Sequence, residues 1–383
     1  MTTLLEGKIT TFTEALQATE LLDQRDNRGK RHEVWFVLLG LAIAFLRNRD
    51  GVLSSLHRSM VNTNTELCEF LGIEFGSVVS RAELPIILQN IDIKIFDDIL
   101  FSYLGIRLPK SSTQWFACDG KELRGSIAKG ATRGEVIVTA VSHQDRLTVA
   151  QDFHDGQKES EIPCVRSLLK ETELEKQKIT LDALHFCPST LHQIEQAGGT
   201  YLIGLKENQK ELCQDMQSAA MRLETKREWI SEPEKSHGRI EFRNYQAFDV
   251  QAEYFDDRWN HANLKTLVKV DRIRYNCKKQ TESKETAYYM SNQLIHETNK
   301  DELFHAIRNH WQIETNNNIR DTSLKEDNLK TSKKGVSRIA AGVRTLAISI
   351  LSKMNVKNIK TQLEKFADNF QHLLTHLRTV GFL

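Results

Sequence analysis

The segment QWFACDG at residues 114–120, followed by GEVIVTAVSHQDRLTVAQDFHDG at residues 134–156, decides the fold of this chain. It contains three short apolar runs rich in β-branched and aromatic residues, which is the pattern of β-strands. The turn HQDR at 143–146 joins the last two runs, so these form a hairpin. The sequence therefore predicts a three-stranded antiparallel meander, with Asp119 at the end of its first strand.

Beyond this meander the pattern alternates helices and strands. EIPCVRSLLKETEL at 161–174 predicts a helix, and KQKITLDAL at 176–184 predicts a short strand that ends at Asp182. STLHQIEQAGG at 189–199 has a helical pattern stopped by two glycines, and TYLIGLK at 200–206 predicts another strand. This order is compatible with an α/β fold built on a ribonuclease-H-like mixed sheet flanked by helices.

We expect four segments along the chain. Residues 1–109 predict a small, mainly helical N-terminal domain, and residues 110–210 hold the first part of the α/β core. Strand-like runs such as RIEFRNYQAFDV indicate that residues 211–292 are a β-rich insertion, some of whose strands complete the main sheet. Residues 293–383 return to helices. They hold the C-terminal part of the core, including its last helix and further packing helices.

The composition is that of a globular protein with balanced charge. Of the 383 residues, 40% are hydrophobic and 27% are charged, and the formal net charge is only +1. A polyanion must therefore be bound by local basic patches, because no global field attracts it. The apolar stretch from Val34 to Leu46 is shorter than the roughly 20 residues that span a bilayer, so it predicts a buried helix.

The six cysteines are scattered along the chain without CxxC pairs. This spacing argues against both a zinc ribbon and a disulfide framework. Free thiols fit a reducing compartment best, so we expect a cytoplasmic protein.

Three acidic residues lie where rigid elements would hold them. Asp119 and Asp182 each end an apolar strand, and Glu314 lies on a predicted helix. Glu314 shares one helical face with polar side chains three, four or seven residues away, namely His310, Asn317, Asn318 and Asp321. Carboxylates are the ligands that Mg²⁺ prefers, and two such ions activate the attacking oxygen and stabilise the leaving oxygen of a phosphodiester. The alternatives are that both aspartates are ordinary strand-end turn residues and that the helical face is solvated.

Five sequence blocks match the signature of a known family in their order. They are CDGKELRGS, TLDALHFC, YLIGLKENQ, HGRIEFR and RNHWQIE. These blocks resemble those of the H-repeat-associated transposases, which are DDE insertion-sequence transposases with a ribonuclease-H-like core. The basic loop RGKR at 28–31, followed by an apolar helix, also resembles the accessory, DNA-binding domain of that family. The resemblance therefore covers nearly the whole chain.

The resemblance implies a catalytic set and a cofactor. Asp119, Asp182 and Glu314 would be the three catalytic carboxylates that hold Mg²⁺, with Mn²⁺ as a substitute. Glu314 lies 132 residues after Asp182 (314 − 182), which leaves room for the β-rich insertion. The chain departs from the family pattern after the glutamate, where Thr315 replaces the usual asparagine and Asp321 comes one residue early. This departure affects the local DNA contacts and leaves Glu314 intact.

Basic, amide and imidazole side chains near these carboxylates are the candidates for DNA contacts. The resemblance places them after Asp119, after the strand at 200–206, in a basic turn of the insertion and before Glu314. The candidates are Lys121, Arg124, Lys206, Asn208, Gln209, Lys210, His237, Arg239, Arg308 and His310. The alternatives are an ion pair between Lys121 and Glu122 and simple solvation of the loop. We expect Trp311 to lie in the core rather than to stack on a base.

The function that the resemblance implies is DNA transposition. The enzyme would cut the ends of an insertion sequence and join them to target DNA by two-metal-ion hydrolysis and transesterification. Its partners would be double-stranded DNA, as terminal inverted repeats and target, and a second copy of the chain, because synapsis joins two ends. It would act in the bacterial cytoplasm, at the nucleoid. Two alternatives stay open: a catalytically inactive or domesticated DNA-binding protein, and a nuclease of the same fold.

Overall fold

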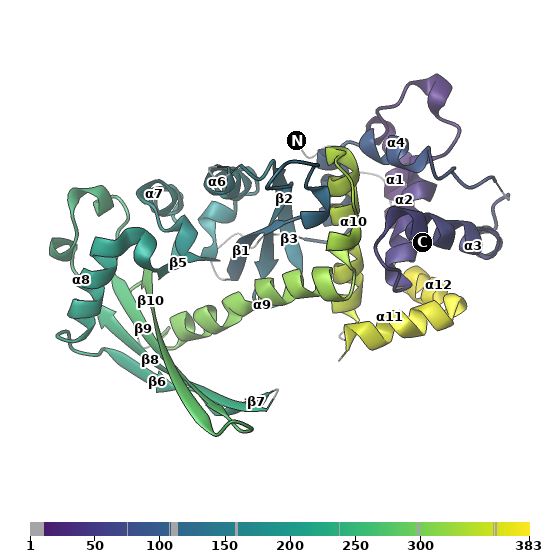
Figure 1. Ribbon diagram of the computed structural model, residues 1–383. Helices are drawn as coiled ribbons and strands as arrows, with labels where there is room; N and C mark the ends of the chain where they lie inside the picture. The colour runs from purple at the N-terminus through teal and green to yellow at the C-terminus, as the bar shows by residue number, and fades with distance from the viewer. Residues whose placement is uncertain are drawn as a thin grey trace.

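The computed structural model describes residues 11–74, 76–106, 108, 114–157, 160–236, 238–296, 299–354, 356 and 358–383 (Figure 1). Within these residues, ten strands form one mixed sheet flanked by helices, which confirms the predicted α/β class. The strand order is β3-β2-β1-β4-β5-β10-β9-β8-β6, and β7 pairs with β8. The first five strands are β1 (Trp115–Glu122), β2 (Val136–Ser142), β3 (Thr148–His154), β4 (Lys178–Leu181) and β5 (Thr200–Leu205).

These five strands form the expected ribonuclease-H-like arrangement. β1, β2 and β3 are an antiparallel meander, and β4 and β5 add to β1 as parallel strands. Asp119 was expected at the end of β1, but the strand continues to Glu122. The reason is that the two neighbours of β1 differ in length: pairing with β4 ends at Cys118, whereas pairing with β2 continues to Glu122.

The insertion extends this sheet, as the sequence predicts. Its helix and strands are α8 (Lys210–Ala220), β6 (Arg227–Ile230), β7 (Glu234–Ser236), β8 (Arg239–Asp249), β9 (Thr266–Asn276) and β10 (Thr281–Ser291). β10 pairs with β5 through Tyr288–Leu205 to Ser291–Leu202, so the insertion is continuous with the core sheet. The far halves of β8, β9 and β10 project from the core as a long twisted ribbon (Figure 1).

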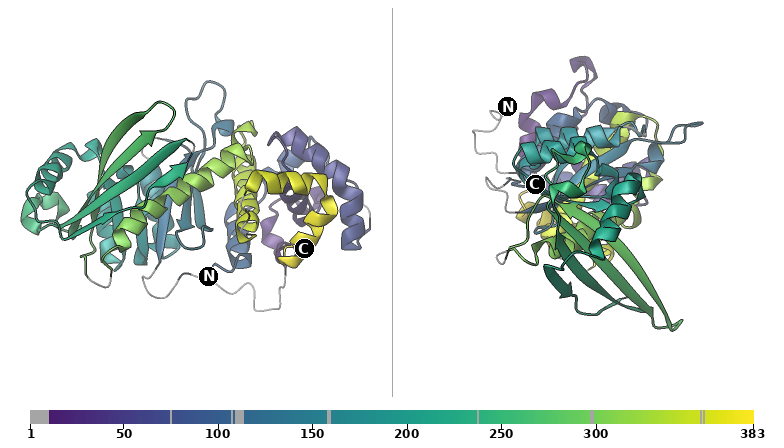
Figure 2. Two further views of the ribbon diagram at one scale, coloured as in Figure 1. Left: turned by 90° about the horizontal axis from the view of Figure 1, so that it is seen from below. Right: turned by 90° about the vertical axis from the view of Figure 1, so that its left-hand side faces the viewer.

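Helices cover both faces of the central strands. α6 (Glu161–Glu171) and α7 (Pro188–Gln196) lie on one face, where their apolar side chains pack with those of β1, β4 and β5. The long helix α9 (Glu302–Thr322) lies on the other face, where Ile313 packs against Ala117 and Val141. Figure 2 shows α9 crossing the strands from the insertion towards the helical end of the molecule. α9 thereby passes over the strands that carry Asp119 and Asp182.

The N-terminal helices share one apolar core with the C-terminal helices. These elements are α1 (Phe12–Ala18), α2 (Val34–Leu46), α3 (Leu53–Leu71), α4 (Leu84–Gln89), α5 (Ile93–Tyr103), α10 (Lys334–Lys353), α11 (Ile359–Asp368) and α12 (Phe370–Thr379). α2 is buried along almost its whole length, as its apolar sequence predicts. The last three helices lie beside the first five, at the opposite end of the molecule from the insertion (Figure 1).

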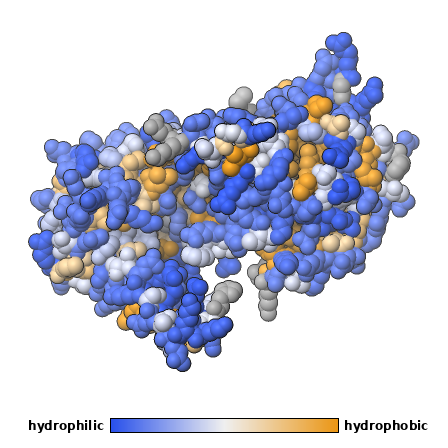
Figure 3. Space-filling view, viewed as in Figure 1, coloured by the Kyte–Doolittle hydropathy of each residue, from blue (hydrophilic) through white to orange (hydrophobic). Residues whose placement is uncertain are grey.

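Helix α10 connects this helical core to the sheet. Its Ala341 packs with Leu123 and Ile137, while most of its other apolar residues face the N-terminal helices. By length and composition α10 is apolar enough to cross a membrane, but 83% of its most apolar window is buried inside the molecule, as is typical of a core helix. The face of the molecule seen in Figure 3 is mostly hydrophilic, with apolar side chains in small separate groups.

Candidate active site

Asp119 of β1 lies beside Asp182, the residue directly after β4, which runs parallel to β1. The register pairs Cys118 of β1 with Leu181, the last residue of β4, and each aspartate is the next residue along the chain. Parallel strands are about 4.8 Å apart, so the two carboxylates share one small region. Asp182 also accepts a hydrogen bond at Oδ1 from the backbone N–H of Leu184 (2.9 Å), which fixes its position at the start of a short 3₁₀ turn.

The proximity of the carboxylates changes the acidity of Asp119. Burial and then the negative charges of Asp182 and Glu161 raise the pKa of Asp119 to about 7. Two like charges in a poorly solvated site resist simultaneous ionisation. A bound cation would offset the repulsion between these carboxylates. The electrostatics of the site therefore favour the binding of a positive ion.

Glu314 approaches the same region from α9. It lines a cleft of about 530 Å³ together with Asp182 and Lys206. Burial raises the pKa of Glu314, and the positive charges of Arg272 and Lys206 act in the opposite direction. One turn further along α9, Asn317 donates a hydrogen bond from Nδ2 to Oδ2 of Asp119 (3.2 Å). α9 therefore contacts Asp119 through this bond and lines the same cleft as Asp182.

The donor chemistry of the three carboxylates suits a divalent metal. Carboxylate oxygens are hard ligands, and Mg²⁺ is commonly held by only one or two of them, with water and substrate phosphate completing its shell. Within the residues that the structure describes, no three histidine, cysteine or acidic side chains converge closely enough to form a complete metal-holding group. The fold thus places Asp182 and Glu314 on one cleft and Asp119 beside Asp182, without closing the three carboxylates around a single point.

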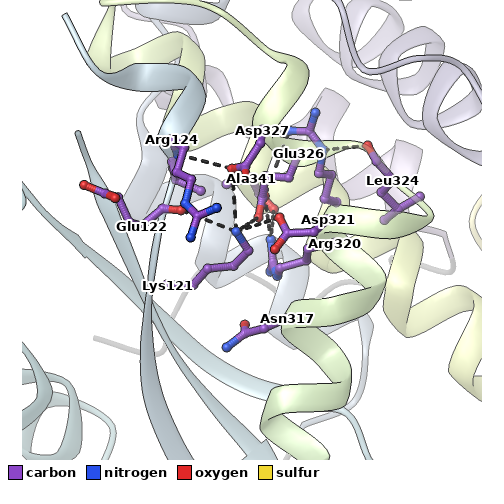
Figure 4. A network of polar contacts seen from close by, with 12 residues as sticks. Lys121, Glu122, Arg124, Asn317, Arg320, Asp321, Leu324, Glu326, Asp327 and Ala341 are labelled. Carbon is purple, nitrogen blue, oxygen red and sulfur yellow. Dashed lines mark hydrogen bonds and ion pairs between the residues drawn. The ribbon is translucent and has the colours of Figure 1, made fainter. Parts of the chain in front are cut away.

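Lys121 lies in a cluster of carboxylates, away from open solvent (Figure 4). Its side chain is 10% exposed, and Nζ lies 2.8 Å from Asp321, 3.7 Å from Glu326 and 3.8 Å from Asp327. The suggested ion pair with Glu122 is replaced by these contacts; Nζ reaches only the backbone carbonyl oxygen of Glu122 (3.3 Å). The cluster ties β1 to the end of α9, so Lys121 has a structural role that its sequence neighbours do not reveal.

The same cluster continues into the interior through two arginines. Arg320 is fully buried and binds Glu326 (3.0 Å) and the carbonyl oxygen of Ala341 (3.2 Å). Arg344 is also buried, and its guanidinium lies 4.0 Å from Glu326. Arg124 contributes only its backbone N–H, which donates to Asp327, and its side chain stays exposed. Of the two basic residues after Asp119, Arg124 is the one available to a phosphate.

The candidate DNA-binding residues in and after the loop that follows β5 differ in exposure and in their contacts. Lys206 and Lys210 are exposed, and Lys206 faces the cleft with Asp182 and Glu314. Asn208 and Gln209 instead donate from their side-chain amides to the carbonyl oxygens of Ala183 (2.5 Å) and Phe186 (3.0 Å). These two amides hold the turn that follows Asp182, so the structure gives them a positioning role.

The remaining candidates are dispersed. His237 lies outside the described residues, and Arg239 is exposed at the start of β8. Arg308 of α9 forms an ion pair with Glu234 (2.8 Å). His310 lines the cleft, and its Nδ1 lies 2.8 Å from the hydroxyl of Thr180.

Trp311 differs from its expected core position, because its residue surface is 49% exposed. Its ring lies between two clefts, one with Glu314 and one with Arg146. The reason is that α9 buries the side of Ile313 against the sheet, which turns Trp311 towards solvent.

Some residues of the site were missed by sequence reasoning. Glu161 raises the pKa of Asp119 although 42 residues separate them (161 − 119). An acidic residue in the first turn is common to many helices, so its position carried no signal. Thr180 and Arg272 sit on strands whose apolar pattern hides them, and only the packing of α9 brings them to the site.

Comparison with known proteins identifies the family of this chain. The model of the transposase DDE domain family matches residues 106–350. The chain is 28% identical to YncI of Escherichia coli O157:H7, named as a candidate transposase, over 76% of this chain and 73% of that protein. It is 29% identical to the protein YbfL of E. coli K12, over 69% of this chain and 71% of that protein.

A further relative confirms the resemblance seen in the sequence blocks. The H repeat-associated protein YhhI of E. coli K12, also named as a candidate transposase, is 28% identical over 69% of this chain and 71% of that protein. The matched range contains both aspartates and Glu314, and the family model spans well over half of the chain. The chain therefore belongs to the transposase DDE domain family.

Proposed function

We propose that the protein is an active transposase that cuts the ends of an insertion sequence and joins them to target DNA. The observation that carries this proposal is that Asp119 of β1 lies beside Asp182, which directly follows the neighbouring parallel strand β4, while Glu314 of α9 lines the cleft next to Asp182. Acidic residues whose pKa is raised by burial and by neighbouring negative charge, as that of Asp119 is, cluster at functional sites. The family supports DNA as the substrate.

The three carboxylates hold the divalent ions, Mg²⁺ or Mn²⁺. When bound, the ions supply the Lewis acidity that activates the attacking oxygen and stabilises the leaving oxygen. Asn317 holds the carboxylate of Asp119 in place, while Asn208 and Gln209 hold the turn after Asp182. These amides keep the ligands on rigid elements, so that less ordering is needed when DNA and metal bind.

Exposed basic side chains around the cleft bind the DNA backbone. Lys206 lines the cleft, and Lys210 and Arg124 are exposed. Arg239 and Arg308 extend this contact towards the insertion, and His237, which lies outside the described residues, is proposed as a further DNA contact. Lys121 serves the carboxylate cluster instead. Because each neutralised phosphate releases counterions, DNA affinity falls as salt rises.

The wider arrangement follows from the same proposal. Residues 1–109 form the accessory DNA-binding domain, 110–210 and 293–383 the catalytic core, and 211–292 the insertion. Two copies of the chain act together, since a transposition event joins two element ends. The reaction takes place in the bacterial cytoplasm, at the nucleoid.

A nicking assay tests the proposal. The substrate is supercoiled DNA carrying the inverted repeats that flank the gene, with Mg²⁺ present. The wild-type chain should cleave at the repeat ends and yield joined products, and Asp182→Asn should abolish both while still binding the ends. Asp215→Asn is the matched control, because Asp215 is an exposed residue of α8.

Each of the other outcomes of the assay supports a different function for this protein. Binding of the ends without any cleavage by the wild-type chain identifies a DNA-binding protein that lacks catalysis. Cleavage without joined products identifies a nuclease of the same fold. Equal cleavage by wild type and Asp182→Asn removes Asp182 from the catalytic set.

A further inference from the structure

A threonine hydroxyl connects two histidines directly beneath the proposed active site. Oγ1 of Thr180 lies 3.1 Å from Nε2 of His143 and 2.8 Å from Nδ1 of His310. Thr180 is on β4, two residues before Asp182, and His143 follows β2; both are buried. His310 belongs to α9, one turn before Glu314. The three side chains thus form one chain of polar contacts from the sheet interior to the cleft.

Both histidines are neutral at physiological pH. Burial lowers the pKa of His310 to about 4, against a smaller opposing effect of Asp182. Burial, with a further contribution from His310, lowers the pKa of His143 to about 3. Each ring therefore carries a single N–H proton, and its position on Nδ1 or Nε2 decides what the ring can donate.

The contacts of His143 decide where its proton lies. Its Nδ1 is buried and has no hydrogen-bond partner among the residues that the structure describes. A buried N–H without an acceptor is rarer in proteins than a buried acceptor without a donor. The proton of His143 therefore lies on Nε2 and is donated to the hydroxyl oxygen of Thr180.

The hydroxyl of Thr180 in turn decides which ring nitrogen of His310 carries the proton. A hydroxyl has one proton to give, and its two acceptors are Nδ1 of His310 at 2.8 Å and the carbonyl oxygen of Phe116 at 3.4 Å. Hydrogen bonds from hydroxyls are commonly about 2.7–2.8 Å long, so the bond to His310 is the stronger one. Nδ1 of His310 is then an acceptor, and its proton lies on Nε2.

His310 itself lines the site. His310 lines both the cleft of about 530 Å³ with Asp182 and a second cleft of about 210 Å³ with Arg243 and Arg272. Glu314 lines both clefts as well. Nε2 has no hydrogen-bond partner within the described part of the chain. A neutral donor is thus held beside the acidic residues, where a DNA phosphate would carry negative charge.

We propose that His143 and Thr180 are positioning residues that fix the proton of His310 on Nε2, from which it is donated to a phosphate oxygen of DNA bound beside Asp182 and Glu314. The donor half of this inference rests on the proposed function. The hydrogen-bonded relay from His143 through Thr180 to His310 is a property of the folded chain and is measured without DNA. A neutral N–H stabilises a phosphate oxygen without competing with a metal for the carboxylates, which a lysine at this position would do.

The relay is tested by the ring tautomer of His310. Protein labelled with ¹⁵N-histidine is observed by long-range proton–nitrogen NMR, and the His310 signals are assigned by their loss in His310→Gln. Wild type and Thr180→Ser, which keep the hydroxyl, should show His310 with its proton on Nε2. Thr180→Val has nearly the same shape without the hydroxyl, and should show a shifted or mixed tautomer. A proton on Nδ1 in the wild type, or no change in Thr180→Val, overturns the relay.

The donor role is tested by two replacements of His310 in the nicking assay. The amide nitrogen of His310→Gln lies near the place of Nε2, so this variant should retain cleavage within about threefold of wild type. His310→Asn places its amide near Nδ1 and should lose about hundredfold, the size found for a lost donor to a transition-state oxygen. Equal losses in both variants overturn the donor role. If the wild type does not nick at all, the proposed function fails, and the NMR result still decides the relay.

Discussion

The side-chain amide of Asn317 donates a hydrogen bond to Oδ2 of Asp119 over 3.2 Å, and this bond joins helix α9 to strand β1. Asn317 lies three residues after Glu314, so both point from the same side of the helix. The bond therefore sets the distance between the strand that carries one proposed catalytic carboxylate and the helix that carries another.

Loss of this bond should slow catalysis without affecting DNA affinity. Asn317→Ala is expected to reduce the cleavage rate by about tenfold to hundredfold, because Asp119 loses the donor that orients it. Affinity for the element ends, measured by fluorescence anisotropy, should stay within about twofold of wild type. Asn318→Ala is the matched control, since its side chain is exposed. An equal effect of both variants on the rate would contradict this positioning role.

Asp119→Asn should stabilise the metal-free protein at alkaline pH. The folded-state pKa of Asp119 is raised from 3.8 to about 7, so the folded state disfavours the ionised carboxylate. The resulting penalty is absent below pH 3.8, grows as pH rises, and is complete above pH 7. Asparagine removes it, so the free energy of unfolding should rise by at most about 4 kcal/mol at pH 8. Urea unfolding at pH 8 and pH 5 measures this gain, which should shrink at the lower pH.

Metal binding should reverse the order of stability between the wild type and Asp119→Asn. Mn²⁺ or Mg²⁺ binds the folded state through the carboxylates, so it should raise the melting temperature of the wild type. Asp119→Asn and Asp182→Asn each remove a charged ligand and should show little or no rise. Differential scanning fluorimetry with Ca²⁺-free buffer and increasing Mn²⁺ gives the comparison. A rise of the same size in all three proteins would place the metal elsewhere.

Lys121→Met separates a structural lysine from a phosphate ligand. Removing its charge leaves Asp321, Glu326 and Asp327 crowded without their cation, so the free energy of unfolding should fall by about 1–3 kcal/mol. The salt dependence of DNA binding should not change. A phosphate contact would instead reduce the slope of log affinity against log salt by about one. Lys129→Met, at an exposed loop position, is the control for both measurements.

Gly125→Ala should destabilise the junction between β1 and the segment after α9. A Cβ at this position would lie 2.2 Å from the carbonyl oxygen of Leu329, and the backbone N–H of Thr331 bonds to Gly125 itself. Because the obstacle is backbone, relief requires the two segments to separate, and a loss of about 2 kcal/mol or more is expected. Gly76→Ala, where the new Cβ meets nothing within 4 Å, should change the urea midpoint very little.

The order of elements was predictable because it depends on local patterns. Short apolar runs rich in β-branched and aromatic residues predicted the meander of β1, β2 and β3, and the shift to helical spacing predicted α6 and α7 between the later strands. The continuation of the insertion into the main sheet was also expected from its strand-like runs. The length of β1 was not, because a strand ends where its partners end, and those partners are distant in sequence.

The amino-acid sequence by itself predicted the fold class from local patterns, and its resemblance to the transposase blocks predicted the three proposed catalytic carboxylates. The tertiary structure alone decided what surrounds them. It placed Lys121 inside a cluster of acids, turned Trp311 to solvent, and brought Glu161, Thr180 and His143 to the site. The physical reason is that charge pairing, burial and hydrogen bonding depend on distance in space. The packing of α9 across the sheet sets those distances, and no short stretch of sequence records them.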